Sequence, residues 1–420
     1  MVTVAVEGCG HGTLNAIYDS LKPGVDILII CGDFQAIRNI TDLQTLNVPP
    51  KYKQLGDFPD YYSGKRKAPV LTIFIGGNHE CSSYLRELQY GGWVAPSIYY
   101  LGEFGSVWYK GIRISGLSGI WNGRTFHTRD QLDYSLPYSP SSLRSVYHVK
   151  PKNLLKLLIS GRSDVVVSHD WPKGIWKFGD ERALLRKKKF FKEDMQSGKL
   201  GSPAARAGLE KLAPSFWFSS HLHVKFTAEF VKNVEEVERA SSSEIELDMD
   251  GPDTNEISLD MDDEPQEKVK KRKVARKTSF LALDKCLPRR SFIDFVEIDP
   301  QDHPSTDSSS LYFDPRALAA QKVVESFIND NSDQWRGLEP QVIIDSAYKS
   351  IRLVEELEAA VTEEAKKFSA SGTDLVIPDN FKRTAPSMDE NKEPPLQYWS
   401  NPQTELMAQK FELPLPRHER

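Results

Sequence analysis

Over its first 230 residues the chain repeats one pattern, in which a short apolar run ends in small residues and a polar side chain follows at once. Short β-branched runs of this kind are typical of buried strands. Between them, Thr13–Leu21 and Tyr84–Gln89 fit short helices, so an α/β or mixed αβ fold is expected over residues 1–240. In such sheets the residues just past the strand ends converge on one edge, where ligands bind. The runs are TVAV before GCGHG, VDILII before CGDF, VLTIFI before GGNHE, DVVV before SHDWP, and SFWF before SSHLH.

This pattern stops between residues 241 and 277. SSSEIELDMDGPDTNEISLDMDDEPQE is rich in acidic residues and has no Lys or Arg, whereas KVKKRKVARK after it is mostly basic. The stretch has too little apolar bulk to form a core, so a disordered linker inserted into the first domain is predicted. TSFLALDKCLPRRSFIDFVEI then indicates two strands around Lys285–Arg290, which would return to the catalytic core over residues 278–300.

Residues 301–420 are expected to form a mostly helical C-terminal domain that is partly disordered at its end. Apolar spacing typical of helices occurs at Phe313–Phe327 and at Tyr348–Lys367. The residues after about 370 are rich in Pro, Asn and charge, and they are predicted to be loosely ordered.

Composition excludes several classes of protein without naming a function. The formal charge of −5 is small for 420 residues, and the 27% charged and 39% apolar content is ordinary for a globular protein. The longest apolar runs are far too short to cross a membrane, so no membrane association is expected. The four cysteines are widely spaced and form no disulfide framework, which favours a reducing compartment.

Metal-binding side chains follow the ends of the predicted strands. Imidazole and carboxylate are the usual ligands of Zn, Fe and Mn ions, and the set exceeds what one tetrahedral ion needs. Two ions about 3.5–4 Å apart with a shared carboxylate fit better, and such a pair is typical of phosphoester hydrolysis. Cys9 by itself would be a small buried residue, a redox thiol or a ligand. The nitrogen and oxygen donors are His11, Asp33, Asn78, His79, His169, His221 and His223.

GDF, GNHE and HLH resemble the signature of the calcineurin-like metallophosphoesterases, whose first element is normally Asp-x-His; here it is Cys9-x-His11. Over residues 1–295 the chain is similar, more specifically, to the intron lariat debranching enzyme family. This resemblance implies a β-sandwich flanked by helices, with a mostly helical C-terminal extension. The matching motifs, in the family's order, are GCGHG, SGIW, LRSVYHVK, SHDWP, LLRKKKFF, LGSPAA, WFSSHLHVKF and FLALDKCLPRR.

The resemblance also implies a role for each donor. His79 is similar to the histidine that protonates the leaving oxygen. Because a thiol stands where the wider superfamily has a carboxylate, Fe²⁺ and Zn²⁺ are expected, with Mn²⁺ as a substitute. One ion would be held by His11, Asp33 and His223 with Cys9 beside it, and a second by Asp33, Asn78, His169 and His221.

The family implies hydrolysis of the 2′,5′-phosphodiester of branched intron RNA, which gives linear RNA. Unpaired RNA is bound through stacking, 2′-hydroxyl and phosphate contacts, and residues 119–150, here called the recognition segment, interleave aromatic and basic side chains. Tyr147 and His148 would alternatively only anchor this segment to the core. Arg186–Lys192 is either a phosphate-binding run or a solvated helix face. The candidate substrate contacts are Trp121, Tyr138, Arg144, Tyr147, His148, Asp170 and Trp171.

Two other functions fit parts of the pattern. A metallophosphoesterase for another substrate, such as a protein phosphatase or a nuclease, would share the donors, but GDFQAI lacks the phosphate-gripping Arg of protein phosphatases. An inactive RNA-binding splicing factor would have no reason to keep the full donor set.

The basic cluster Lys270–Val274 lies in the predicted flexible linker, where a nuclear import receptor would reach it. A nuclear location is therefore expected, and shuttling to the cytoplasm is compatible with it.

Overall fold

Two stacked β-sheets form the centre of the larger compact unit, Met1–Phe230 with Lys277–Arg420. The computed structural model describes residues 1–127, 133–237, 271–330, 352–370 and 374–416. The first sheet has the order β12-β1-β2-β3-β5-β4 and the second β10-β11-β9-β8-β7-β6-β13. The first sheet contains β1 (Val2–Glu7), β2 (Ile27–Ile30), β3 (Leu71–Phe74), β4 (Gly92–Ala95), β5 (Ile98–Tyr100) and β12 (Ile293–Ile298). The second contains β6 (Phe104–Tyr109), β7 (Ile112–Leu117), β8 (Val165–Ser168), β9 (Phe216–Ser219), β10 (Phe226–Val237), β11 (Lys271–Ala282) and β13 (Tyr312–Phe313).

Alternate residues of the central strands enter two different cores. Val4 and Ile29 point between the sheets, where they share a core with Val167 of the second sheet. Leu28 and Ile30 point to the opposite face, where helices cover the first sheet. Because both faces of these strands are buried, their sequences are largely apolar rather than strictly alternating.

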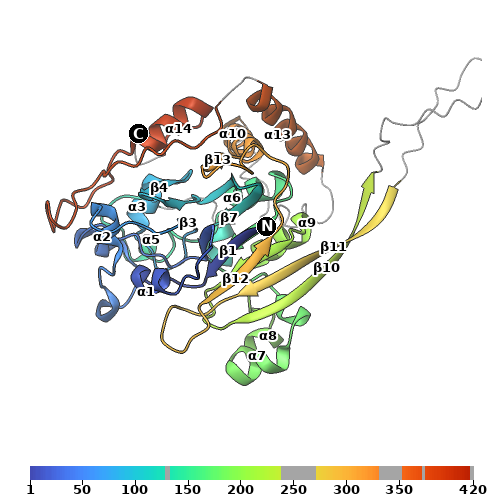
Figure 1. Ribbon diagram of the computed structural model, residues 1–420, viewed down its shortest axis with the longest axis horizontal. Coiled ribbons are helices and arrows are strands. Elements are labelled where there is room, and N and C mark those ends of the chain that lie inside the picture. Colours follow the sequence, from blue (N-terminus) through green and yellow to red (C-terminus); the bar gives the residue numbers. More distant parts are fainter. Residues whose placement is uncertain (128–132, 238–270, 331–351, 371–373, 417–420) are drawn as a thin grey trace, which may run out of the picture. The chain divides into compact units, whose positions relative to one another are not determined.

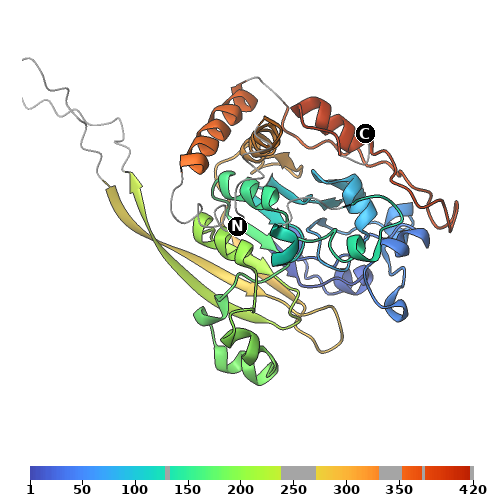
Figure 2. The same ribbon diagram turned by 180° about the vertical axis from the view of Figure 1, so that it is seen from behind.

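Helices cover the outer face of each sheet. Side chains of α1, α2 and α3 pack on the first sheet, and those of α6, α9 and α10 pack on the second. Figures 1 and 2 show the C-terminal helices gathered at one side of this unit and α7 with α8 at the opposite end. The α-helices are α1 (Leu14–Asp19), α2 (Phe58–Ser63), α3 (Ser82–Glu87), α4 (Gly123–His127), α5 (Pro140–Leu143), α6 (Pro151–Ile159), α7 (Glu181–Lys187), α8 (Phe191–Gln196), α9 (Pro203–Leu212), α10 (Pro315–Asp330), α13 (Arg352–Ala370) and α14 (Pro402–Phe411). Short 3-10 helices lie at Thr41–Thr45, Pro50–Tyr52 and Ile175–Phe178.

The predicted apolar runs all form strands, namely β1, β2, β3, β8 and β9. β1, β2 and β3 are parallel neighbours in the first sheet, and β8 and β9 are parallel neighbours in the second. The carboxyl ends of parallel neighbours meet at one edge, so the motifs that follow these strands are brought together. The expected β-sandwich flanked by helices is confirmed.

The segment after the acidic stretch returns to both sheets. β11 pairs in parallel with β9, whereas β12 pairs antiparallel with β1, which confirms two strands over residues 278–300. The predicted linker is too long at its C-terminal end, because residues 271–277 already belong to β11. Residues 241–270 lie outside the described part of the chain. Val231–Arg276 group as a second, small unit that contains residues 231–237 of β10 and 271–276 of β11.

The C-terminal residues were predicted less well. α10 and α13 confirm the two expected helices, and they belong to the same compact unit as Met1–Phe230. The expectation of loose order after residue 370 is wrong for residues 374–416. There α14 begins at an Asn401 side chain that accepts from Gln403 N, and it buries Phe411. Among the described residues, no helix is long and apolar enough to span a membrane.

Candidate metal centre

The loops after β1, β2 and β9 bring one group of donors together. His11 Nε2 lies 3.3 Å from His223 Nε2 and 3.7 Å from Asp33 Oδ2. Imidazole nitrogens facing one another and a carboxylate oxygen form a donor set typical of Zn²⁺, Fe²⁺ and Mn²⁺ sites. With Cys9, the potential ligand atoms of this group all lie within 4.8 Å of one another.

A second group lies on the other side of Asp33. His169 Nε2 is 3.4 Å from Asp33 Oδ1, and the His169 ring centroid lies 5.0 Å from that of His221. His169 Nδ1 contacts the carbonyl oxygen of Cys31 at 2.7 Å. This contact fixes the tautomer with the proton on Nδ1, so that Nε2 keeps its lone pair for a cation.

Three polar atoms in this region are buried and have no hydrogen-bond partner: Asp33 Oδ2, Asn78 Oδ1 and His169 Nε2. Buried polar atoms are nearly always hydrogen-bonded. Asn78 uses its Nδ2 group on the ring of His79 at 3.0 Å, which leaves the amide oxygen free. All three atoms belong to predicted ligands of the second ion. The residues therefore fit a two-metal site centred on Asp33.

Burial and neighbouring charges together set the pKa values of the ligands. Burial alone would raise the pKa of the Asp33 carboxyl, but His169, His11 and His79 hold it well below its usual range. Burial, followed by the charge of His11, lowers the pKa of His223 to about 3. The aspartate is thus ionised and the imidazole of His223 neutral near pH 7, which are the protonation states that bind metal.

Several of the donors stand on strained backbone. His11, Asp33, His221 and His223 have φ values of 43°, 49°, 56° and 50°, a left-handed region that is uncommon for residues other than glycine. Strain of this kind persists where the surroundings enforce it, most often at functional sites. Gly77 lies close by, and a Cβ there would be 2.3 Å from Asp33 Oδ1.

His79 is held in place by Asp33 and by Asn47, and a second residue outside the predicted set, Glu80, braces the loops around it. The His79 backbone N–H donates to Asp33 Oδ1 at 2.8 Å, and its Nδ1 lies 3.0 Å from the carbonyl oxygen of Asn47. Glu80 accepts from the backbone N–H groups of Phe34 and Gly77 at 2.8 and 3.0 Å. Glu80 is part of the GGNHE motif, so a sequence signal for it existed. Nothing in the sequence around Asn47 indicated its contact.

Cys9 is fully buried beside His11, Asp33 and His223. Burial, and then the charge of Asp33, raise the pKa of its thiol well above the usual range. In the metal-free protein the group is therefore a neutral thiol, and a metal that used its sulfur would have to displace the proton.

Exchanging Cys9 tests whether it selects the metal. Cys9→Asp is expected to shift the preference toward Mn²⁺ by about 10-fold, because carboxylates favour hard ions. Cys9→Ser is expected to lower the Zn²⁺ and Fe²⁺ content. Metal analysis after competition among the three ions measures both effects. If both variants keep the wild-type content and preference, Cys9 is only a packing residue.

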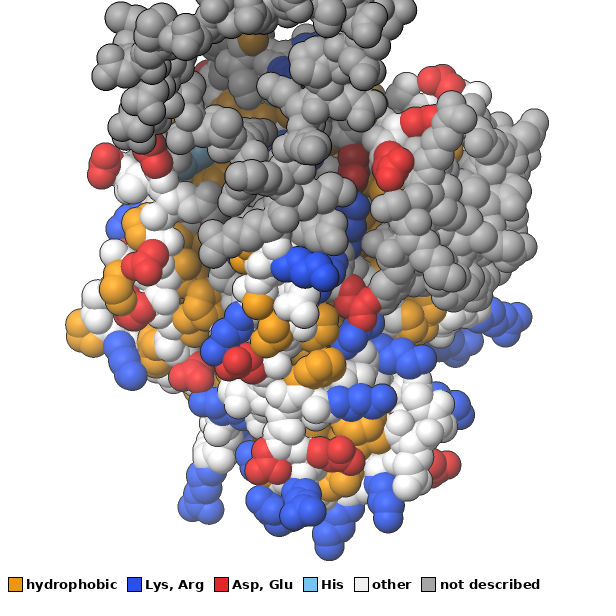
Figure 3. All heavy atoms as spheres, turned by 90° about the vertical axis from the view of Figure 1, so that its right-hand side faces the viewer, with side chains coloured by type: hydrophobic (Ala, Val, Ile, Leu, Met, Phe, Trp, Pro, Cys, Tyr) orange, Lys and Arg blue, Asp and Glu red, His pale blue; other side chains and the backbone are white. Residues whose placement is uncertain are grey.

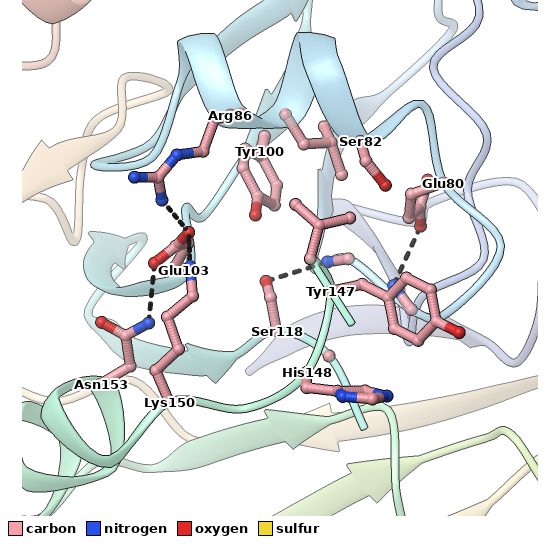
Figure 4. Close-up of a pocket in the computed structure, with 15 residues that line it drawn as sticks. Glu80, Ser82, Arg86, Tyr100, Glu103, Ser118, Tyr147, His148, Lys150 and Asn153 are labelled. Atoms are coloured by element: carbon pink, nitrogen blue, oxygen red, sulfur yellow. Dashed lines mark hydrogen bonds and ion pairs between the residues drawn. The ribbon is translucent and has the colours of Figure 1, made fainter. Parts of the chain in front are cut away.

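Tyr147 and His148 lie beside this centre, at the edge of a cavity of about 50 Å³ that Gly77 and Glu80 also line (Figure 4). A space of this size holds a few water molecules. Tyr147 accepts from Asn47 Nδ2 at 2.7 Å. Burial lowers the pKa of His148 to about 4, so this ring is neutral near pH 7.

Three of the other predicted substrate contacts lie next to the centre or behind it. Asp170 accepts from the backbone N–H of Trp121 at 2.8 Å and lies 3.9 Å from the His221 ring, so both are next to the centre. Trp171 is 1% exposed and donates to the carbonyl oxygen of Ser220. It therefore supports the site from behind and offers no ring to a substrate.

Within the described residues, the remaining two candidates, Tyr138 and Arg144, form no hydrogen bond or ion pair with the metal ligands. Tyr138 is bonded to Tyr398, at 2.8 Å between the hydroxyl oxygens, and Arg144 is exposed.

Basic side chains flank the centre. Lys285 follows β11. Burial is the largest cause of the lowered pKa of His11 and of His223, and the positive charge of Lys285 lowers both further. Burial lowers the pKa of Lys188 as well, with Arg290 and Lys285 adding to the effect. In Figure 3, Lys and Arg side chains gather over the lower part of the face, where Figure 1 places α7 and α8. Phosphate groups would be attracted to this region.

A two-sheet sandwich with His, Asp and Asn donors at one edge defines a calcineurin-like phosphoesterase, and the family model of that description matches residues 4–225. A second model, described as the lariat debranching enzyme C-terminal domain, matches residues 275–416. The chain belongs to the lariat debranching enzyme family.

Proteins named lariat debranching enzyme match this chain over most of its length. The lariat debranching enzyme of Danio rerio is 42% identical over 417 residues, which are 96% of this chain and 65% of that protein. The Homo sapiens enzyme is 40% identical, with 97% of this chain and 68% of that protein covered. The Schizosaccharomyces pombe enzyme is 37% identical, and here the match covers 96% and 94%. This chain thus spans about two thirds of the animal relatives and nearly all of the yeast protein.

Proposed function

We propose that this chain hydrolyses the 2′,5′-phosphodiester bond at the branch point of excised intron lariats and so converts them to linear RNA. The observation that carries the proposal is the group of unpaired, buried ligand atoms around Asp33, next to a recognition segment with Tyr147 and His148 at its inner end. The names of the relatives support the choice of substrate.

Two divalent metals would activate water and neutralise charge on the phosphate. Fe²⁺ and Zn²⁺ are proposed as the native pair, with Mn²⁺ as a substitute, because imidazoles and a thiol prefer borderline ions. Asp33 would be shared by both metals. His11, His223 and Cys9 would complete one side, and Asn78, His169 and His221 the other.

His79 is proposed as the general acid. Its Nδ1–H donates to the carbonyl oxygen of Asn47, which orients the ring. Nε2 would then deliver a proton to the departing 2′-oxygen of the branch nucleotide. Asn78 Nδ2 lies 3.0 Å from this nitrogen in the substrate-free protein, and the substrate oxygen would replace that contact.

Replacing Lys187, Lys188 and Lys189 with Ala is expected to weaken binding of branched RNA and to flatten its salt dependence. Lys187 and Lys189 are exposed and Lys188 is half-buried, so they are available to phosphates. Each lost phosphate contact reduces the magnitude of the negative slope of log K against log salt by about 0.7. Titrations at several salt concentrations measure the slope. An unchanged slope would make this run a solvated helix face.

The proposed function is tested by incubating the metal-loaded protein with a short branched RNA and separating the products on a gel. Conversion of the branched species to linear strands is expected. A linear RNA of the same sequence, which has only 3′,5′ bonds, should stay intact. Cleavage of both RNAs would identify a general nuclease, and cleavage of neither would contradict the proposal.

A nuclear location remains part of the proposal because introns are excised there. The basic cluster is a weaker argument than the sequence suggested. Residues 271–274 are the first residues of β11 rather than part of a flexible linker, and Lys270 lies outside the described residues. An import receptor would need this strand to open.

A further inference from the structure

Tyr398, which lies in the C-terminal segment (residues 374–416), contacts the recognition segment directly. Tyr398 Oη donates to the carbonyl oxygen of Tyr134 at 2.7 Å. Since that contact uses its only proton, the Tyr138 hydroxyl donates to Tyr398 Oη across 2.8 Å. Burial raises the pKa of Tyr398 to about 12, so the hydroxyl stays protonated. One side chain thus joins two points of the recognition segment.

A group of charged residues holds the same segment from the other side. Glu103 accepts from Arg86, from Lys150 and from Asn153, the last at 2.9 Å. The Arg86 guanidinium also lies 4.0 Å from the centroid of the Tyr134 ring. Figure 4 shows Arg86, Lys150 and Asn153 converging on Glu103, across the cavity from Tyr147 and His148. Tyr134 is therefore fixed by its ring on one side and by its carbonyl group on the other.

The far end of the recognition segment reaches the catalytic histidine. Tyr147 accepts from the Asn47 side chain, and the Asn47 carbonyl oxygen is the partner of His79 Nδ1. The segment thus runs from the Tyr398 contact to the group that orients His79.

We infer that Tyr398 is a positioning residue, which holds the recognition segment in the shape that binds the branched RNA. The inference rests on the proposed function and gives the C-terminal segment a role in it. Neither hydroxyl bond is needed to attach the C-terminal segment to the core, because other contacts do so. The backbone N–H of Trp399 donates to Glu87 Oε1 at 3.1 Å, and Tyr62 Oη donates to the carbonyl oxygen of Ala385 at 2.8 Å.

Tyr398→Phe removes only the hydroxyl group and tests this inference. Two lost hydrogen bonds should raise the KM for a branched RNA about 5-fold or more, while kcat stays within about twofold because no metal ligand or proton donor is touched. Hydrogen exchange should increase in peptides that contain residues 133–150. Tyr62→Phe is the matched control, since it removes the hydrogen bonds that join α2 to Thr384 and Ala385 of the C-terminal segment without touching the recognition segment. Its KM should stay at the wild-type value.

Tyr138→Phe supplies a second, independent variant. It removes the Tyr138 hydroxyl from the same hydrogen bond. The rise in KM of the double variant with Tyr398→Phe should therefore be smaller than the two single effects combined. An unchanged KM in Tyr398→Phe would overturn the inference, as would an equal rise in Tyr62→Phe. The wild-type protein is assayed beside them, so failure of the proposed function is recognised separately by its inability to cleave branched RNA.

Discussion

Replacing His79 with alanine is expected to lower the turnover of branched RNA by about 10²–10⁴-fold, the usual contribution of a general acid. His79 contacts Asp33 only through its backbone N–H, and its ring is turned toward Asn47. The metal content should therefore remain close to that of the wild-type protein. Single-turnover rates and metal analysis on the same preparation measure the two quantities.

The metal content decides how this result is understood. A slow variant that retains its metals supports a role in proton transfer. A variant that purifies without metal would show that the imidazole is a ligand and that the division of roles between Asn78 and His79 is wrong.

Asp33→Asn is expected to cost more than any other single change at the centre. The side chain keeps its shape, but it loses the charge that both metal ions would share, and no hydrogen bond within the protein holds its Oδ2 atom. Several kcal/mol of stabilisation should disappear, which corresponds to about 10³-fold or more in rate. Binding of both metals should weaken together.

Asp164→Asn is the matched control for this change. Asp164 accepts from the backbone N–H of Arg113 at 2.9 Å just before β8 begins, whereas His169 follows the end of the same strand. The control should keep both its metals and its activity. Loss of only one metal in Asp33→Asn would contradict a shared aspartate.

The strands that carry the site were predictable because their local pattern and their burial agree. β1, β2, β3, β8 and β9 are buried on both faces, so each is a continuous apolar run that ends where a donor follows. The edge elements gave weaker signals. β10 mixes polar and apolar residues, and α14 depends on an Asn401 cap and on a buried Phe411 that only the fold reveals.

The donors were predictable for the same reason, whereas their supports were not. His11, Asp33 and His169 follow strand ends in the sequence. Asn47 lies in a loop without a motif, and its contact to His79 depends on the path of the chain between β2 and β3. Tyr398 lies 260 residues from its partner Tyr138, a separation that no local pattern encodes.

The ends of the products test the central claim most directly. A branched RNA is cleaved by the metal-loaded protein in ¹⁸O-labelled water, and the products are mapped by mass. In-line attack on the phosphate with His79 as acid predicts a 2′-hydroxyl on the branch nucleotide and a 5′-phosphate that carries one ¹⁸O on the released strand. A 2′-phosphate on the branch nucleotide would contradict this mechanism.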